Sequence, residues 1–225
     1  MNAKALSILT AAMALAVAAC GGSSAPTSSA PSAKFVAGVD NPWFPLKPGS
    51  EWHYRGLKDG KPSTEVVRVT GTTKVIQGVT TTAVDDKLYL DGKLEERTTD
   101  WYAQDRQGNV WYFGEDTAEL DSQGNVKSTE GTWKAGVDGA QAGIFMTADP
   151  RPGQSARQEY YKGHAEDHFK VLRRSRSSVL TMEWTPLEPG VIDHKSYRRG
   201  VGTVLENTVK GGAERNVLLS FKAGS

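Results

Sequence analysis

The 225-residue chain carries 27 Lys and Arg residues against 26 Asp and Glu residues, a formal net charge of +1. Its basic residues are dispersed along the sequence, and this balance argues against nucleic acid as a partner. A single cysteine, Cys20, excludes disulfides and cysteine-based metal sites, so the fold must be stabilised by a packed core.

The N-terminus, residues 1–19, has the pattern of a bacterial signal peptide. One positive charge at Lys4 precedes an apolar stretch from Ala5 to Ala19, which is too short to span a membrane as a helix. No later segment approaches the roughly 20 apolar residues that such a helix needs. We therefore expect an exported protein without a transmembrane helix.

The apolar stretch ends in Val17-Ala18-Ala19-Cys20, which resembles the lipobox of bacterial lipoprotein precursors. The resemblance implies cleavage before Cys20 and a diacylglyceryl group on its thiol, which anchors the protein to a membrane. In a Gram-negative envelope it implies the outer membrane, because a glycine rather than an aspartate follows Cys20. Residues 20–33 then form the lipidated cysteine and a flexible tether, since residues 21–33 contain no charged or aromatic side chain.

Residues 34–225 are expected to form a single β-rich domain, because no second low-complexity linker divides them. Val- and Thr-rich segments flank turn signals such as Gln77-Gly78 and Asp91-Gly92. The predicted strands cover residues 51–54, 64–76, 79–90, 93–104, 110–120, 126–133, 157–172, 179–185, 191–197, 201–209 and 215–221, with a Gly- and Pro-rich crossing at 135–153. About ten strands in an antiparallel meander predict a curled sheet or incomplete barrel, with a two-layer β-sandwich as the alternative.

The domain opens with a proline-rich lead-in, Asn41–Gly49, that places Trp43 and Phe44 between prolines. Proline fixes the backbone and removes hydrogen-bond donors, so this segment is expected to be rigid and extended. Trp43 and Phe44 are predicted to plug one end of the sheet, because large aromatic side chains are core residues first.

A predicted hairpin carries large aromatic rings on both of its faces. Strand alternation separates Trp101 from Tyr102 and Trp111 from Tyr112. One face must line the core, while the other packs under a second layer or lines an apolar ligand groove. Trp101, Tyr102, Trp111 and Tyr112 are therefore candidate ligand contacts.

Several longer motifs resemble a family of uncharacterised bacterial exported proteins. They are NPWFPLKPG, GNVWYFGED, GTWKAGVDGAQAG, YYKGHAED and EWTPLEPG, and the resemblance covers nearly all of residues 41–210. The resemblance implies a place in the cell envelope and no particular activity. The chain departs from the family at residues 173–178, a short stretch that takes the place of a longer segment before EWTPLEPG.

One titratable cluster, His164, Glu166 and His168, has spacing that could suit a metal ion. On a strand these three side chains would project from one face, and His194 could add a ligand from another strand. The set would then offer imidazoles and a carboxylate to a divalent metal. A solvated surface is the competing interpretation, because no recognised metal-binding spacing supports the cluster.

Signatures of known enzyme classes such as G-x-S-x-G and H-E-x-x-H are missing from the sequence. Four acidic residues could supply a carboxylate pair for hydrolysis of a cell-wall glycan: Glu159, Glu166, Asp167 and Glu183. The favoured interpretation is a non-enzymatic envelope module that binds a hydrophobic small molecule or an envelope protein. A metal-binding protein or metal-assisted hydrolase and a structural envelope protein are the alternatives.

Overall fold

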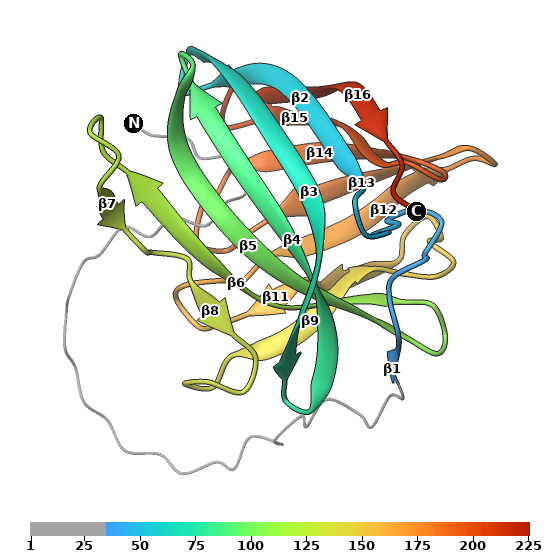
Figure 1. Cartoon of the computed structure of the whole chain (residues 1–225). Coiled ribbons are helices and arrows are strands. Elements are labelled where there is room, and N and C mark those ends of the chain that lie inside the picture. The colour runs from blue at the N-terminus through green and yellow to red at the C-terminus, as the bar shows by residue number, and fades with distance from the viewer. Residues whose placement is uncertain (1–34) are drawn as a thin grey trace, which may run out of the picture.

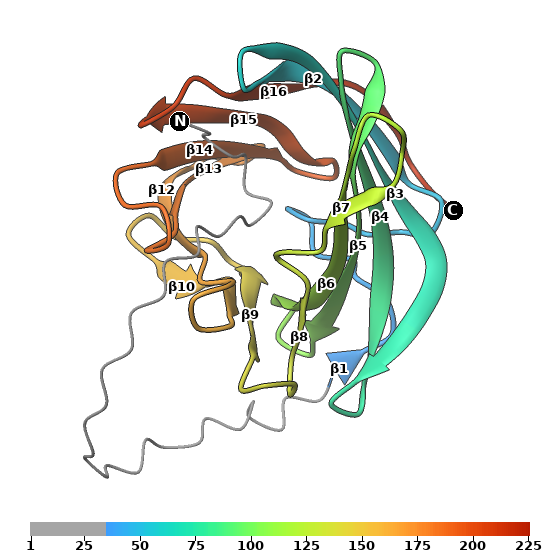
Figure 2. The same cartoon turned by 90° about the vertical axis from the view of Figure 1, so that its left-hand side faces the viewer.

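The computed structural model describes residues 35–225 as one antiparallel β-sheet that is nearly closed into a barrel (Figure 1). The signal peptide, Cys20 and the tether expected at residues 1–33 lie outside the described residues. Seen from a perpendicular direction, β12 to β16 form one side of the barrel and β3 to β6 the other (Figure 2). Between Phe35 and Ser225, no helix is long and apolar enough to cross a membrane.

Sixteen strands form within the described residues. In chain order they are β1 (Phe35–Val36), β2 (Glu51–Lys58), β3 (Lys61–Ile76), β4 (Val79–Leu90), β5 (Lys93–Asp105), β6 (Val110–Leu120), β7 (Val126–Ser128), β8 (Trp133–Lys134), β9 (Gln141–Met146), β10 (Ser155–Arg157), β11 (Glu159–Tyr160), β12 (His168–Arg174), β13 (Ser178–Trp184), β14 (Ile192–Arg198), β15 (Gly202–Lys210) and β16 (Arg215–Lys222). Around the sheet their order is β10, β12, β13, β14, β15, β16, β2, β3, β4, β5, β6, β9, β11, with β1 beside β5 and both β7 and β8 beside β6.

The all-β, antiparallel prediction is confirmed, and one curled sheet is found rather than a two-layer sandwich. The expected number of about ten strands is wrong. Five of the sixteen strands, namely β1, β7, β8, β10 and β11, contain only two or three residues. Strands this short hold too few side chains to leave an alternating pattern in the sequence.

The predicted strands at 79–90 and 93–104 match β4 and β5 closely, because their hairpin turns have a strong local preference. Gln77 and Gly78 both have positive φ, at 50° and 76°, and Asp91 and Gly92 repeat this with 50° and 79°. Two consecutive residues with positive φ are the signature of the two-residue turn that matches strand twist. The register of β3, β4 and β5 is therefore encoded locally.

The predicted strand at 157–172 is wrong, because a turn interrupts it. The N–H groups of His164 and Ala165 both donate to the Tyr161 carbonyl at 2.8 Å, and Gly163 has a φ of 77°. Pairing resumes only at His168, where β12 begins. The crossing at 135–153 in turn contains a strand, β9, that the sequence pattern did not predict.

The barrel closes through a short segment in which the chain changes partners. β10 pairs with β12, β11 pairs with β9, and Gln158 alone separates β10 from β11. A Cβ on Gly143 of β9 would lie 2.4 Å from the Gln158 carbonyl oxygen, so only glycine permits this approach. One residue therefore connects the two ends of the sheet.

The proline-rich lead-in closes one end of the barrel, which we call the closed end. Trp43 is only 1% exposed. The Asn41 side-chain amide donates to the carbonyl oxygens of Gly108 at 2.8 Å and Thr147 at 3.2 Å, and its backbone N–H donates to Gln104 Oε1 at 2.8 Å. These bonds fix the lead-in to the β5–β6 hairpin and to the residue that follows β9. At the opposite end, which we call the mouth, lie the β2–β3, β4–β5 and β15–β16 turns (Figure 1).

Candidate functional site

The barrel encloses a cavity of about 210 Å³. Its walls are inward-facing side chains, because alternation directs every second residue of a barrel strand to the interior. Leu57, which is 40% exposed, and the exposed Arg215 line the cavity at the mouth, so the cavity reaches the surface there. Pockets for drug-sized ligands measure roughly 300–1,000 Å³, so this cavity suits a small molecule.

Six aromatic side chains line the cavity, and four of them are in contact with one another: Phe44, Tyr102, Tyr112 and Phe145. We call these four the aromatic floor. The rings of Tyr102 and Tyr112 stack with their centroids 4.8 Å apart. Phe145 meets these two rings edge-on at 5.1 and 5.9 Å, and Phe44 meets Tyr102 in the same way at 5.2 Å. The floor is held by its own ring contacts before any ligand arrives.

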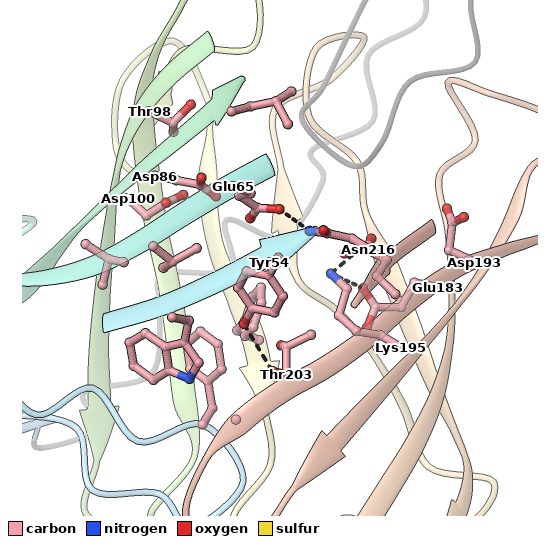
Figure 3. Close-up of a pocket in the computed structure, with 18 of the residues that line it drawn as sticks. Tyr54, Glu65, Asp86, Thr98, Asp100, Glu183, Asp193, Lys195, Thr203 and Asn216 are labelled. Atoms are coloured by element: carbon pink, nitrogen blue, oxygen red, sulfur yellow. Dashed lines mark hydrogen bonds and ion pairs between the residues drawn. The ribbon is translucent and has the colours of Figure 1, made fainter. Parts of the chain in front are cut away.

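A belt of carboxyl groups surrounds the cavity on the mouth side of the floor. Its members are Glu65, Asp86, Asp100, Glu115, Glu159, Asp167, Glu183 and Glu206. Figure 3 shows Glu65, Asp86 and Asp100 on one wall and Glu183 with Lys195 on the facing wall. Nearer the mouth, Glu96, Asp193 and Glu214 also line the cavity, so eleven acidic side chains face only three basic ones, Lys58, Lys195 and Arg215.

A bulge in β6 brings Glu115 to the belt. Simple alternation from Tyr112 would turn Asp116 inward, but Trp101 pairs with Gly114 and Tyr102 pairs with Tyr112, so β6 holds one extra residue. Gly114 has a φ of 134°, and a Cβ there would lie 2.4 Å from the Trp133 carbonyl oxygen. Because of this bulge, Tyr112 and Glu115 both line the cavity while Asp116 is exposed.

Lys195 neutralises one side of the belt. Its Nζ lies 3.2 Å from Glu183 Oε2 and 3.5 Å from Glu206 Oε1. Tyr197 and Thr181 donate hydroxyl hydrogen bonds to Glu183 Oε1 at 3.1 and 2.8 Å. Burial lowers the pKa of Lys195, but the charges of Glu183 and Glu206 outweigh it and raise that pKa well above its ordinary value. This side of the belt is therefore satisfied by the protein itself.

The other side, which we call the acidic wall, consists of Glu65, Asp86, Asp100, Glu115, Glu159 and Asp167. Among residues 35–225, no basic nitrogen lies within 4.0 Å of any of these six carboxyl groups. Glu65 accepts a hydrogen bond from the Asn216 side-chain amide (Figure 3). Glu159 is 2% exposed and has the Trp133 indole N–H beside its carboxyl group, while the carboxyl groups of Asp86 and Glu65 share a hydrogen bond.

Burial among like charges suppresses ionisation of several carboxyl groups of the acidic wall. Burial, reinforced by the charge of Glu65, raises the pKa of Asp86 well above its ordinary value. Burial raises the pKa of Asp100 to about 7, although the Tyr112 hydroxyl lowers it by donating to Oδ1 at 2.5 Å. Burial and the neighbouring Asp100 together raise the pKa of Glu115 well above the usual range. These shifts favour the protonated form of the three carboxyl groups in the empty cavity, and a bound cation would favour their ionised form instead.

Two of the four aromatic residues predicted as ligand contacts line the cavity, namely Tyr102 and Tyr112. The other two do not. Trp101 is buried beneath the Lys74 ammonium group, which lies 3.7 Å from the ring centroid. Trp111 donates its Nε1 hydrogen to Asp105 Oδ2 at 2.9 Å. Alternation predicted the separation of the two faces but not which face is inside.

The structure does not bring together the residues considered for a metal site, His164, Glu166, His168 and His194. The turn that interrupts the predicted strand removes the expected one-sided arrangement. His164 stacks on Tyr161 with centroids 4.4 Å apart, and Glu166 Oε1 accepts the Gly163 N–H at 2.7 Å. Within the described part of the chain, no group of three or more His, Cys, Asp or Glu residues is arranged to hold a metal ion.

Three of the four acids considered for hydrolysis line the cavity: Glu159, Asp167 and Glu183. The belt as a whole was not predicted, because its members come from strands that are far apart in the sequence. A local signal exists at Asp86, which alternates with the cavity-lining Val84 and Leu88. One acid between two apolar residues at alternating positions of a strand indicates that a polar group faces the interior.

The fold and the cavity define an antiparallel β-barrel with an acidic interior site. No protein-family model matches the chain, and no curated protein matches it either. The chain is similar to the crystal structure of a putative lipoprotein from Parabacteroides distasonis, with a TM-score of 0.41 and 10% identity. That similarity covers 80% of this chain and 98% of the other.

Proposed function

We propose that this chain is a membrane-anchored lipoprotein of the bacterial cell envelope whose barrel binds a small molecule in its interior cavity. The lipobox ending at Cys20 supports the anchor. The observation that carries the binding function is the cavity, which combines an aromatic floor with carboxyl oxygens that lack partners. A buried polar group without a partner costs about 1–3 kcal/mol, so several of them in one cavity favour a partner from outside the chain.

The position of the described N-terminus supports an anchored binding protein. Phe35 pairs with Asp105 through β1 and β5, next to the plug at the closed end. An anchor that precedes Phe35 is therefore attached at the end opposite the mouth. The mouth then stays accessible to a ligand in the surrounding envelope.

A cavity-blocking variant tests the binding function. Thr98 and Thr99 are consecutive on β5; Thr98 lines the cavity, and Thr99 does not. Native mass spectrometry of the purified protein, before and after solvent extraction, should show a bound small molecule in the wild type and in Thr99→Trp but not in Thr98→Trp. Thermal melting of both variants checks that the fold is retained.

Two results would contradict the proposal. One is a wild-type protein that neither carries a ligand nor binds any member of a mixed library of small molecules. The other is a folded Thr98→Trp variant that holds the same ligand with the same affinity. Either result would leave a structural role in the envelope as the better explanation.

A further inference from the structure

We infer that the ligand is a small organic cation, which places one or more protonated amino groups against the acidic wall and an apolar part on the aromatic floor. This inference rests on the proposed function, because it assumes that the cavity holds a ligand. It names the chemical class of that ligand from three separate observations.

The first observation is the excess of carboxyl groups over basic groups in the cavity. Of the three basic residues that line it, Lys195 is held by Glu183 and Glu206. Arg215 is exposed at the mouth, and Lys58, the buried last residue of β2 at the same end, is near Glu214, whose pKa its charge acts to lower. No basic group is left for the acidic wall. A cation that enters the cavity favours the ionised form of these carboxyl groups and supplies their counter-charge, whereas an anion would make ionisation still less favourable.

The second observation is a set of buried carboxyl oxygens without hydrogen-bond partners. Glu159 is 2% exposed and Glu214 is 8% exposed, and both line the cavity. Both carboxyl oxygens of Glu214 have no hydrogen-bond partner within the described chain, and the Glu159 carboxyl group has the Trp133 indole N–H as a neighbouring donor. An ionised carboxylate only accepts hydrogen bonds, and an ammonium group only donates them, so the two are complementary.

The third observation is the contact between wall and floor. Tyr112 belongs to the aromatic floor, yet its hydroxyl donates to Asp100 of the acidic wall. A cation held by Asp100 therefore lies next to the aromatic floor, at the hydroxyl edge of Tyr112. The same rings accommodate the apolar part of an amine. A bare metal ion has no apolar part that could pack against these rings.

The size of the cavity limits the candidates to small amines. A volume of about 210 Å³ excludes peptides and long polyamines in full, but it admits an arylalkylamine or a short diamine. Phenethylamine and 1,5-diaminopentane are therefore suitable probes. Their uncharged counterparts, 2-phenylethanol and 1,5-pentanediol, have nearly the same shape. Comparing each amine with its alcohol therefore separates the effect of the charge on affinity from the effect of the shape.

Isothermal titration calorimetry of the purified mature protein at pH 8 tests the inference. We expect at least one amine to bind at least tenfold more tightly than its matching alcohol. Glu115→Gln and Glu159→Gln should each weaken amine binding by about tenfold. Asp116→Asn removes the same kind of charge from the next residue of β6, which is exposed, and should leave amine binding unchanged.

Several outcomes would overturn the inference. If the alcohols bind as tightly as the amines, or if both glutamine variants bind amines like the wild type, the ligand class is wrong while the binding function stands. Calcium chloride that binds more tightly than either amine would replace the organic cation by a metal ion. If neither the amines nor the alcohols bind and the purified protein carries no ligand, the proposed function fails as well. A neutral or anionic molecule extracted from the wild type would also overturn the inference that the ligand is a cation. This result does not depend on whether the variants fold.

Discussion

Asp100 on β5 and Glu115 on β6 are directly paired across two antiparallel strands, so two carboxyl groups face each other inside the barrel. Like charges at directly opposed positions destabilise a sheet, and a low-dielectric interior strengthens the repulsion. The pair therefore favours a protonated state when the cavity is empty. The stability of the empty protein should consequently depend on pH.

The empty barrel should lose stability as the pH rises from about 4 to about 7. In the folded state the pKa values of Asp100 and Asp167 are raised to about 7, and the charges that face Asp100 come from Glu96, Glu65 and Asp85, all acidic. In the unfolded chain an Asp has a pKa near 3.9. Between these values the folded state binds more protons, so raising the pH favours unfolding. Urea denaturation at pH 4.5, 6 and 8 measures the trend, and a free energy of unfolding that increases over this range would contradict it.

Glu115→Gln should stabilise the empty protein at pH 8 by about 1–3 kcal/mol, because glutamine needs no proton to remain neutral beside Asp100. At pH 4.5 the gain should largely disappear, since Glu115 is then protonated in the folded state and about half protonated in the unfolded chain. Asp116→Asn, on the exposed face of the same strand, should change the stability by less than about 0.5 kcal/mol at both values. Chemical denaturation of the two variants at both pH values gives the comparison. A Glu115→Gln effect that is equal at both pH values would show that repulsion in the acidic wall is not the cause.

Gly114→Ala should destabilise the barrel by about 2–4 kcal/mol, because the new Cβ meets the Trp133 carbonyl oxygen and the residue must keep a φ of 134°. The matched control is Gly124→Ala. Gly124 has a φ of 84° in an open turn, and a Cβ there meets nothing within 4 Å. Gly124→Ala should lower the free energy of unfolding by only about 1–2 kcal/mol. Equal losses in the two variants, measured by urea denaturation, would mean that the β6 bulge tolerates a side chain.

Trp43→Ala should destabilise the protein by about 3–5 kcal/mol, because it leaves a large cavity where the plug fills the closed end. Trp43→Phe keeps most of the apolar volume and should lose clearly less. Guanidinium denaturation monitored by circular dichroism gives both values. If alanine cost less than about 1 kcal/mol, the plug would not be part of the cooperative core.

Cys20→Ser should release the folded domain into the soluble fraction, because lipidation of Cys20 is the anchor that the sequence predicts. Fractionation of cells that express either protein, followed by immunoblotting, measures the release. A variant that stays in the membrane fraction after a high-salt wash would reveal a second means of attachment.

The sequence by itself determined the local features of this protein. Turn pairs such as Gln77-Gly78 set the register of neighbouring strands, and prolines around Trp43 predicted a rigid plug, because these preferences act between residues that are adjacent in the chain. The lipobox at Cys20 is likewise a contiguous pattern. Each of these features can be recognised without knowing how the sheet closes.

Only the tertiary structure decided which faces line the interior and which acids meet there. A single extra residue before Gly114 reverses the alternation of β6, so that Glu115 faces inward in place of Asp116. No periodic pattern in the sequence predicts this bulge. The belt joins residues from Glu65 to Glu206, and it exists because the partner change at Gln158 closes the sheet. Long-range closure, rather than any local preference, concentrates the carboxyl groups into one cavity.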